Sequence, residues 1–568
     1  MNHLTYLGHE AFTYLIRKVE KDRTNNRWDL AEIATSDLME HQLLDRNVVE
    51  PCKNQDNRIE IGRKSSESLA EEKLTQCNSQ TPQQDKLPPL VNALKTKAEQ
   101  NVASFHFPGH NRGLAAPSSL TRLIGVEPFV HDLPNALPEL DNLFCPEGPI
   151  LDAQQQAAKL FGSSETWFLV GGTTCGIQAS IMATCSPGDI LILPRNSHIS
   201  TISAMIFSGA VPKYIIPDYN SNWDIAAGVE RAIMELEMEG LKPAAVYVTC
   251  PTYHGICSNL SEISRMCHSQ GIPLIVDEAH GAHLGFHSQF PCSALQQGAD
   301  LVVQSTHKVL CSLQQSSMLH MSGNLVDRGR ICRCLQTLQS TSPSYLLLAS
   351  LDAARSHLSE NPEGILEKAL KIAVEAKDMI EKVPGVSVLG FQSFPKFPAI
   401  DPLRLTIGFE QLGLSGHDAY EILYKDHEIV GELVGTRCIT FAFNLGTSRE
   451  HVRRLVSGLK HIVSSQAFIQ GDKRRKKHVD SAPFADIRTS LIPRDAFFKS
   501  KRKMSIENCI GEVCGELICP YPPGIPAMIP GETITERALN YLLDVRSKGA
   551  IIVGASDPQL SSIVVCNS

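Results

Sequence analysis

Short, almost uninterrupted apolar runs recur between residues 104 and 306, and amphipathic segments separate them. The runs are 166–172, 189–194, 244–251, 273–280 and 300–306. Strands that are apolar along their whole length are typical of a parallel sheet covered by helices on both faces. The segment 260–271, which ends in glycine, predicts one of these helices. The pattern therefore predicts an α/β domain built on a mostly parallel sheet.

The same pattern divides the 568 residues into four regions. Residues 1–98 are polar, and their composition predicts a variable, partly disordered region, with a helix over 88–100. Residues 99–360 form the major domain. A long helix at 362–383 opens a small α/β domain, 361–470, with strands at 386–391 and 403–409 and a helix at 417–427.

Residues 471–568 form a C-terminal domain that begins with the basic run DKRRKK, 472–477. A charge run of this kind is typical of a solvated linker. The segment 519–532, CPYPPGIPAMIPGE, contains too many prolines for a helix or a central strand. We expect it to be a rigid extended loop.

Composition narrows the classes of function. The net charge of −8 argues against a nucleic-acid surface, which the basic run alone would suggest. No apolar run reaches the ~18 residues of a membrane span. The N-terminus lacks the apolar core of a signal peptide and is too acidic for a typical transit peptide, so we expect a cytoplasmic protein, with a plastid location as the alternative. The 17 cysteines are scattered and predict reduced thiols and no metal site.

Polar clusters follow the predicted strands at their carboxyl ends, where ligands gather in parallel sheets. After the first strand, Gly172, Thr173 and Thr174 begin a helix, and their backbone N–H groups and hydroxyls suit an anion. When this cluster is taken alone, a simple helix cap is the better explanation. After the second strand comes His198, which alone is compatible with a structural histidine.

Asp277 ends a buried strand and needs a partner there. A salt bridge, a helix cap or a protonated ring nitrogen would each supply one. One strand–helix step later, Lys308 closes the sequence QSTHK, which also contains Ser305 and His307.

Taken together, the four clusters match the requirements of pyridoxal phosphate. Its phosphate needs backbone and hydroxyl donors, its ring needs a stacking partner, and its pyridine nitrogen needs a carboxylate. Its aldehyde needs a lysine for a Schiff base. We therefore predict that pyridoxal phosphate is the cofactor.

Longer motifs carry a family resemblance: FHFPGHNRG (105–113), PELDNLFCPEGPI (138–150), VDEAHGAH (276–283), GADLVVQSTHK (298–308), QSTSPSYLLLASLD (339–352) and PYPPGIPAMIPGE (520–532). The chain resembles the bacterial-type Orn/Lys/Arg decarboxylase family of fold-type-I pyridoxal-phosphate enzymes. The resemblance implies an aspartate-aminotransferase-like large domain with a small domain and a C-terminal domain. The sequence of this chain departs from the family's pattern at two positions. Asn111 follows PGH, and Ile199 separates His198 from Ser200.

The resemblance also implies roles for single residues. Lys308 would form the Schiff base, and Asp277 would pair with the pyridine nitrogen. His198 would stack on the ring, with Ala279 on its other face. The phosphate would be bound by Gly172, Thr173, Thr174, Ser305 and His307.

Further implied roles concern the substrate and a second subunit. His280 would lie near the substrate, and Glu532 would line its entrance. Thr341 and Ser342 would reach the phosphate of a neighbouring subunit, which implies a homodimer, or a higher homo-oligomer, with shared active sites.

The activity implied by the resemblance is decarboxylation of arginine, lysine or ornithine to agmatine, cadaverine or putrescine, as in polyamine biosynthesis. The fold also supports transamination and aldol cleavage with the same cofactor. A non-catalytic paralogue that regulates a partner enzyme is a third possibility. The motifs do not choose among the three amino acids.

Overall fold

The structure is a computed structural model that describes residues 87–135, 137–467, 485–521 and 524–567. The predicted disorder before residue 87 and the basic run 472–477 lie outside these residues.

The central feature is a seven-stranded sheet of the order β1-β10-β9-β8-β6-β2-β3. Five neighbours, β9, β8, β6, β2 and β3, run parallel, while β10 is antiparallel to both β9 and β1. The mostly parallel sheet predicted from the apolar runs is thus confirmed. The strands are β1 (Glu165–Leu169), β2 (Ile190–Pro194), β3 (Val211–Ile215), β6 (Ala245–Thr249), β8 (Leu274–Asp277), β9 (Leu301–Gln304) and β10 (Ser317–Met321).

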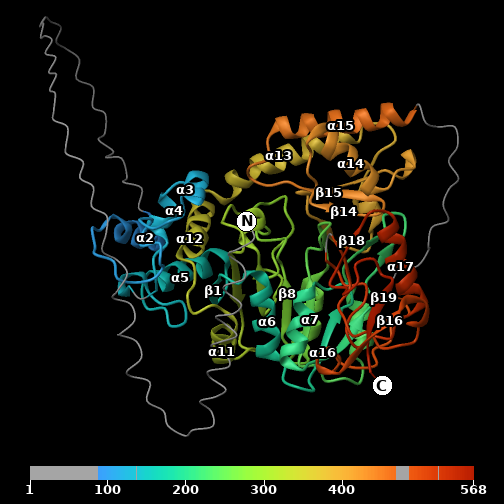
Figure 1. Cartoon of the computed structure of the whole chain (residues 1–568), viewed down its shortest axis with the longest axis horizontal. Helices are drawn as coiled ribbons and strands as arrows, with labels where there is room; N and C mark the ends of the chain where they lie inside the picture. Colours follow the sequence, from blue (N-terminus) through green and yellow to red (C-terminus); the bar gives the residue numbers. More distant parts are fainter. Residues whose placement is uncertain (1–86, 136, 468–484, 522–523, 568) are drawn as a thin grey trace, which may run out of the picture. The chain divides into compact units, whose positions relative to one another are not determined.

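Alternate residues of each strand enter different cores, because successive side chains of a strand point to opposite faces. Ile275 and Val303 pack in one cluster with residues of α6 (Gly172–Thr184), α7 (Ile199–Ser208) and α11 (Arg328–Leu338). Val276 and Val302 pack in another with residues of α8 (Arg231–Met238) and α9 (Leu260–Ser269). Figure 1 shows α6 and α7 side by side along the sheet.

The predicted N-terminal helix is present as α2 (Pro89–Glu99). Its buried Leu90, Leu94 and Ala98 share a core with residues of α5 (Pro149–Phe161) and α12 (Tyr345–Glu360). The Leu90 backbone N–H also donates to Asp352 Oδ2 at 2.8 Å. We therefore place the start of the major domain at α2, earlier than residue 99. Two short helices, α3 (Ser118–Ile124) and α4 (Glu127–His131), follow.

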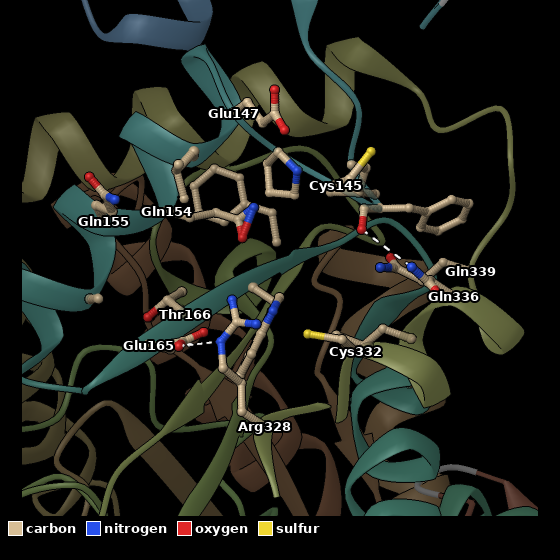
Figure 2. Close-up of a pocket in the computed structure, with 18 of the residues that line it drawn as sticks. Cys145, Glu147, Gln154, Gln155, Glu165, Thr166, Arg328, Cys332, Gln336 and Gln339 are labelled. Atoms are coloured by element: carbon tan, nitrogen blue, oxygen red, sulfur yellow. Dashed lines mark hydrogen bonds and ion pairs between the residues drawn. The ribbon is translucent and has the colours of Figure 1, made fainter. Parts of the chain in front are cut away.

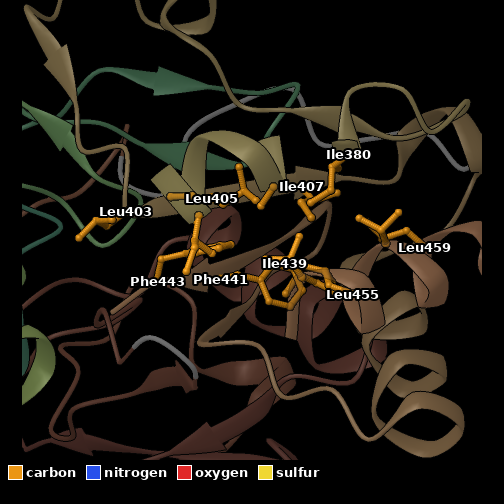
Figure 3. Packing of buried hydrophobic residues seen from close by; sticks show 14 of the residues in the cluster. Ile380, Leu403, Leu405, Ile407, Ile439, Phe441, Phe443, Leu455 and Leu459 are labelled. Carbon is orange, nitrogen blue, oxygen red and sulfur yellow. The ribbon is translucent and has the colours of Figure 1, made fainter. Parts of the chain in front are cut away.

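The small domain has an antiparallel sheet of order β11-β13-β15-β14, made of β11 (Ser387–Val388), β13 (Arg404–Gly408), β14 (Leu433–Val434) and β15 (Cys438–Ala442). The helices α13 (Pro362–Ile380), α14 (Gly416–His427) and α15 (Arg449–Ala467) pack with it. In its core, Ile407, Ile439 and Phe441 meet Leu455 and Leu459 of α15 (Figure 3). This sheet carries several residues of the site described below.

The C-terminal domain pairs β16 (Lys501–Ser505) with β19 (Ser562–Cys566), and β17 (Cys519–Tyr521) with β18 (Ile551–Val553). It also contains α16 (Pro493–Phe498) and α17 (Glu536–Ser547). The proline-rich segment 519–532 therefore begins as a strand, where only a loop was predicted. A two-stranded sheet leaves one edge of each strand free, which is where Pro520 is tolerated.

Two observations bear on the expectations from composition. The described cysteines are free thiols, and most of them are buried. Among the described helices, none combines the length and the apolar character that crossing a membrane requires.

Candidate active site

The predicted clusters meet at the carboxyl edge of the parallel strands. Asp277 is the last residue of β8, and Ser305 follows β9 directly. Ser305 is the N-cap of a short helix, α10 (Thr306–Val309), which carries Lys308. His198 is the N-cap of α7, four residues after β2. Because parallel strands end at one edge, these side chains come together although up to 110 residues separate them along the chain.

Three hydroxyls lie together at the beginning of α6. Thr173 Oγ1 is 2.5 Å from Ser305 Oγ and 3.1 Å from Ser317 Oγ. Gly172, at φ +72°, makes the left-handed turn that starts the helix. Hydroxyls at the N-terminus of a 13-residue helix suit a phosphate dianion, so this part of the chain fits the predicted cofactor. Sequence reasoning missed Ser317, because the strand β10 was not recognised.

Two other residues predicted to bind the phosphate are Thr174 and His307. Thr174 is exposed. His307 Nδ1 lies 2.8 Å from the Ser316 carbonyl oxygen, to which it donates, and this leaves Nε2 as the ring nitrogen that is able to reach an anion. Burial lowers the pKa of His307. A neutral His307 therefore offers a phosphate a hydrogen-bonding nitrogen rather than a charge.

Asp277 is buried, and both hydrogen-bond donors that reach its carboxylate within the described structure are neutral. Tyr247 Oη donates to Asp277 Oδ2 at 3.0 Å, and the Ala279 backbone N–H donates to Oδ1 at 3.0 Å. Burial, and then the Asp277 charge, raise the pKa of Tyr247 well above its usual range, so the phenol remains a donor. A buried carboxylate without a basic side chain as partner fits a protonated ring nitrogen.

Lys308 and His280 form the reactive pair. Lys308 Nζ lies 3.0 Å from His280 Nε2. Burial lowers the pKa of Lys308, although Asp277 and Glu432 oppose the shift. Burial, and then the Lys308 charge, lower the pKa of His280 well below its usual range. The imidazole is thus neutral, and its Nε2 accepts a hydrogen bond from Lys308. Burial favours the neutral amine, which is the nucleophilic form of the lysine.

His198 caps its own helix. Its Nδ1 accepts from the Ser200 backbone N–H at 3.2 Å and lies 2.9 Å from Ser200 Oγ. Burial lowers the pKa of His198, so the ring is neutral. The inserted Ile199 does not prevent this cap. Ala279, predicted for the other face of the ring, is buried beside Asp277.

Two charged residues of the small domain were missed from the sequence. Arg404, in β13, is buried, and its Nη2 donates to the His280 carbonyl oxygen at 3.1 Å. Its Nε has no hydrogen-bond partner among the described residues. The Arg404 charge lowers the pKa of both Lys308 and His280, whereas the Glu432 charge raises that of Lys308. The sequence places Arg404 in a strand but gives no sign that this strand docks on His280.

A buried row of polar side chains crosses the sheet behind the site. Gln304 Nε2 donates to Glu278 Oε2 at 2.7 Å, His320 Nε2 lies 3.1 Å from Gln304 Oε1, and Thr166 Oγ1 lies 2.8 Å from His320 Nδ1. The Ala294 backbone N–H donates to the other Glu278 oxygen at 2.7 Å. Burial raises the pKa of Glu278 to about 8. The row links the end of β8 to β9. Its Glu278 follows Asp277 in the sequence, and its Gln304 precedes Ser305.

Glu532 is buried and forms an ion pair with Arg195. Its two carboxylate oxygens accept from Arg195 Nε and Nη2, each at 2.7 Å, and Oε2 also accepts from the Ile529 backbone N–H at 3.0 Å. Arg195 is fully buried and begins the turn that leads to His198. This ion pair joins the C-terminal domain to the end of β2, and the role of Glu532 at the substrate entrance stays a prediction.

Thr341 and Ser342 lie in an exposed loop before α12. The Thr341 carbonyl oxygen accepts from Asn135 Nδ2 at 2.8 Å. Nearby, a cavity of about 590 Å³ opens beside β1, and its lining includes Gln154, Arg328 and Gln339 (Figure 2). Figure 2 shows Arg328 paired with Glu165 at the rim. This cavity contains neither Lys308 nor Asp277 in its lining, so it is separate from the site.

Comparisons with known proteins show the family of the chain. The sequence model of the Orn/Lys/Arg decarboxylase major domain matches residues 88–396, and that of the C-terminal domain matches residues 478–552. The arginine decarboxylase of Bacillus subtilis (strain 168) is 37% identical over 485 residues, which cover 84% of this chain and 97% of the relative. The constitutive lysine decarboxylase of Escherichia coli (strain K12) is 24% identical, over 81% of this chain and 78% of the relative.

Among solved structures, the Francisella novicida lysine decarboxylase LdcF has a TM-score of 0.73 and 23% sequence identity. The match covers 85% of this chain and 82% of that one. This similarity shows the fold, and it confirms the fold class that the alternation of strands and helices predicts.

Proposed function

Because the chain belongs to the Orn/Lys/Arg decarboxylase family and is a pyridoxal-phosphate-dependent decarboxylase, we propose that it converts arginine to agmatine. Decarboxylation of a basic amino acid is supported by relatives named for arginine or lysine. We favour arginine because four relatives at 34–37% identity are arginine decarboxylases. An amine product of this kind would feed polyamine biosynthesis.

The observation that carries the proposal is the Lys308–His280 pair beside the buried Arg404. A carbonyl group of the cofactor reacts with the neutral form of a lysine amine, and burial shifts the pKa of Lys308 toward that form. The α-carboxylate of an amino acid is attracted by the Arg404 guanidinium, whose Nε is not satisfied by the described residues. The site thus provides a nucleophile at one position and an anion partner at another.

Bound pyridoxal phosphate supplies the electron sink that accepts the bonding electrons when CO₂ leaves. The chain contributes binding and protons. Thr173, Ser305 and Ser317 would hold the phosphate, and the Asp277 carboxylate would keep a proton on the pyridine nitrogen. Lys308 Nζ, which shares a hydrogen bond with His280 Nε2, is placed to return a proton to the substrate α-carbon.

Exclusion of water is the remaining contribution of the chain. Asp277, His280, Ser305 and Arg404 are each 5% exposed or less, and Tyr253 is 9% exposed. Because these side chains are so little exposed to solvent, the attraction between opposite charges is stronger there than in bulk water. A closed pocket also protects the carbanionic product of CO₂ loss from side reactions.

We further propose that the chain acts as a dimer with shared sites. Phe105, Phe107, Leu114 and Leu123 are 98%, 86%, 87% and 78% exposed, an unusual amount of apolar surface for one short stretch. A second copy that covers them would also bring Thr341 and Ser342 near its partner's phosphate site. Size-exclusion chromatography with light scattering tests the dimer, and mixing Lys308→Ala with Thr341→Ala subunits tests the shared site by complementation.

The substrate is tested by CO₂ release from arginine, lysine and ornithine in parallel, with the full chain loaded with cofactor. We expect release from arginine at the highest kcat/KM and one amine formed for each CO₂. A keto acid or an aldehyde in place of the amine would indicate transamination or aldol cleavage. A loaded protein that releases no CO₂ from any of the three would contradict the proposal and favour a regulatory paralogue.

A further inference from the structure

A small cavity of about 110 Å³ lies where the major, small and C-terminal domains meet. Each domain contributes part of its lining, which includes Asp224, Tyr253, Leu433, Thr436, Ile525 and Tyr541. The cavity thus combines one carboxylate and several hydroxyls with apolar walls. An amino-acid side chain with an aliphatic stem and a polar end has the same distribution of groups.

Asp224 is the acid in the described lining of this cavity. Its carboxylate accepts short hydrogen bonds from Tyr219 Oη and Thr436 Oγ1, and both donors are neutral. Arg437 lies nearby, but its guanidinium is 3.8 Å from Glu410 Oε1 and donates to the Asn222 carbonyl oxygen. The Asp224 charge is therefore held in place by hydroxyls and not neutralised by a cation of its own.

The other titratable groups in the lining do not supply that cation. Burial lowers the pKa of His254 to about 4, and it also lowers the pKa of His417. Both imidazoles are thus neutral at physiological pH. The tyrosines remain protonated, because burial and the Asp224 charge raise the pKa of Tyr541. A cation that enters the cavity would meet one negative charge and no positive one among these groups.

The cavity adjoins the reactive pair through one aromatic ring. Tyr253 lines the cavity, and its ring centroid is 5.0 Å from that of His280. His280 Nε2 in turn lies 3.0 Å from Lys308 Nζ. The extended side chain of arginine or lysine reaches about 6–7 Å beyond its α-carbon. This reach is comparable with the 5.0 Å between the Tyr253 and His280 rings, and a single aromatic ring separates the cavity from the reactive pair.

We propose that this cavity is the subsite for the distal cationic group of the substrate, with Asp224 as its counter-charge and Leu433 and Ile525 along its aliphatic stem. The inference rests on the proposed function, since it presumes a basic amino acid. Glu432 is the competing carboxylate, because its charge also reaches Lys308. Glu432 is exposed, and solvent and salt screen an exposed charge far more than an enclosed one.

The test compares arginine with citrulline, which has nearly the same shape and no side-chain charge. Equilibrium dissociation constants for both are measured on the full chain in the Lys308→Ala background, which does not consume arginine, so that the result does not depend on turnover. In Asp224→Asn we expect arginine to bind about 10- to 100-fold more weakly, as is typical for loss of a charged hydrogen-bond partner. Citrulline binding should stay within about 2-fold.

Two further variants separate charge recognition from structure. Thr436→Val removes a hydroxyl that holds Asp224 but keeps the carboxylate, and it should retain most of the preference for arginine. Glu432→Gln should retain it as well. Loss of the preference in Glu432→Gln, with Asp224→Asn unaffected, would overturn the proposal.

These measurements separate failure of the proposed subsite from failure of the proposed reaction. If the wild-type chain releases no CO₂ but Asp224→Asn still loses its preference for arginine, the subsite stands and the reaction is wrong. If CO₂ is released and the preference survives in Asp224→Asn, the reaction stands and the subsite is wrong. Should lysine prove the better substrate, lysine and norleucine form the equivalent pair.

Discussion

The two ends of the site are built in different ways. At the cofactor end, Thr173, Asp277, Ser305 and Lys308 each follow a strand of one sheet within a few residues. At the proposed substrate end, the contacts join different domains: Arg404 with His280, and Thr436 with Asp224. The ion pair of Glu532 with Arg195 is a further contact between domains. The first end depends on strand order, whereas the second depends on how three domains dock. Strand-end motifs are therefore readable in the sequence, and docking contacts are not.

Two adjacent carboxylates show the same contrast within one strand end. Asp277 and Glu278 point to opposite faces because side chains alternate along a strand. Asp277 lies beside Lys308 and its hydrogen bonds come from Tyr247 and Ala279. Glu278 is held by Gln304 and Ala294, away from the reactive groups. Similar chemistry thus serves the cofactor on one face and the alignment of two strands on the other.

The largest effect should come from the cofactor end. We expect Lys308→Ala to lower kcat by at least about 1,000-fold, because the nucleophile that binds the cofactor is removed. The visible absorbance of covalently bound cofactor should disappear as well. The control is Lys371→Ala, an exposed lysine paired with Glu367. An unchanged absorbance band in Lys308→Ala would mean that another lysine binds the cofactor.

The next largest effect should be a loss of stability when the Glu532–Arg195 ion pair between domains is broken. Glu532→Gln leaves the Arg195 guanidinium buried without its counter-charge, and breaking a buried pair costs about 3–5 kcal/mol. Chemical denaturation should show this loss in the free energy of unfolding, with Glu536→Gln in α17 as the control. If Glu532 lines the substrate entrance instead, KM will rise while stability is retained.

Asp277→Asn should lower kcat by about 100-fold, since a neutral amide does not hold a proton on the pyridine nitrogen. The fold should survive, because the amide oxygen still accepts from the Ala279 N–H and the amide NH₂ is able to donate to Tyr247 Oη. Steady-state kinetics and thermal denaturation measure the two effects separately. Asp426→Asn, on the exposed side of α14, serves as control. Equal activity in the two variants would remove Asp277 from the site.

The smallest effect is a pH dependence. The pKa of Glu278 is raised to about 8 in the folded chain, so the unfolded chain loses this proton at lower pH. The contribution of Glu278 to stability therefore falls as pH rises from about 4.5 to about 8. Relative to Glu278→Gln, the wild type should lose about 2 kcal/mol of unfolding free energy between pH 6 and pH 8. A constant difference between the two across this range would contradict the shift.

Much of the cofactor end was predictable from the sequence. An apolar run predicts a buried strand, and a polar residue directly after it is brought to the shared edge of the sheet. Lys308, Asp277 and Thr173 follow this rule. Ser317 escaped because it begins the antiparallel strand β10, whose short sequence SMLHM is interrupted by a polar histidine. A short strand with a buried histidine is not recognisable by its hydrophobicity.

The substrate end was not predictable, for a physical reason. Arg195 and Glu532 are separated by 337 residues, and Asp224 and Thr436 by 212. No local pattern of hydrophobicity or propensity encodes such pairs, because they form only when complete domains pack together. The resemblance of the PGE motif supplied a role for Glu532 but not its partner. Arg195, which follows a strand like the recognised residues, could have been noticed as a charge at a buried strand end.

The most direct test of the account is the stoichiometry of the reaction with carboxyl-labelled arginine. The full chain with pyridoxal phosphate is incubated with the labelled substrate, and labelled CO₂ and agmatine are measured together in the wild type and in Lys308→Ala. We expect one CO₂ for each agmatine from the wild type and neither product from the variant. Agmatine formation by Lys308→Ala at the wild-type rate, or consumption of arginine by the wild type without release of the label, would contradict the account.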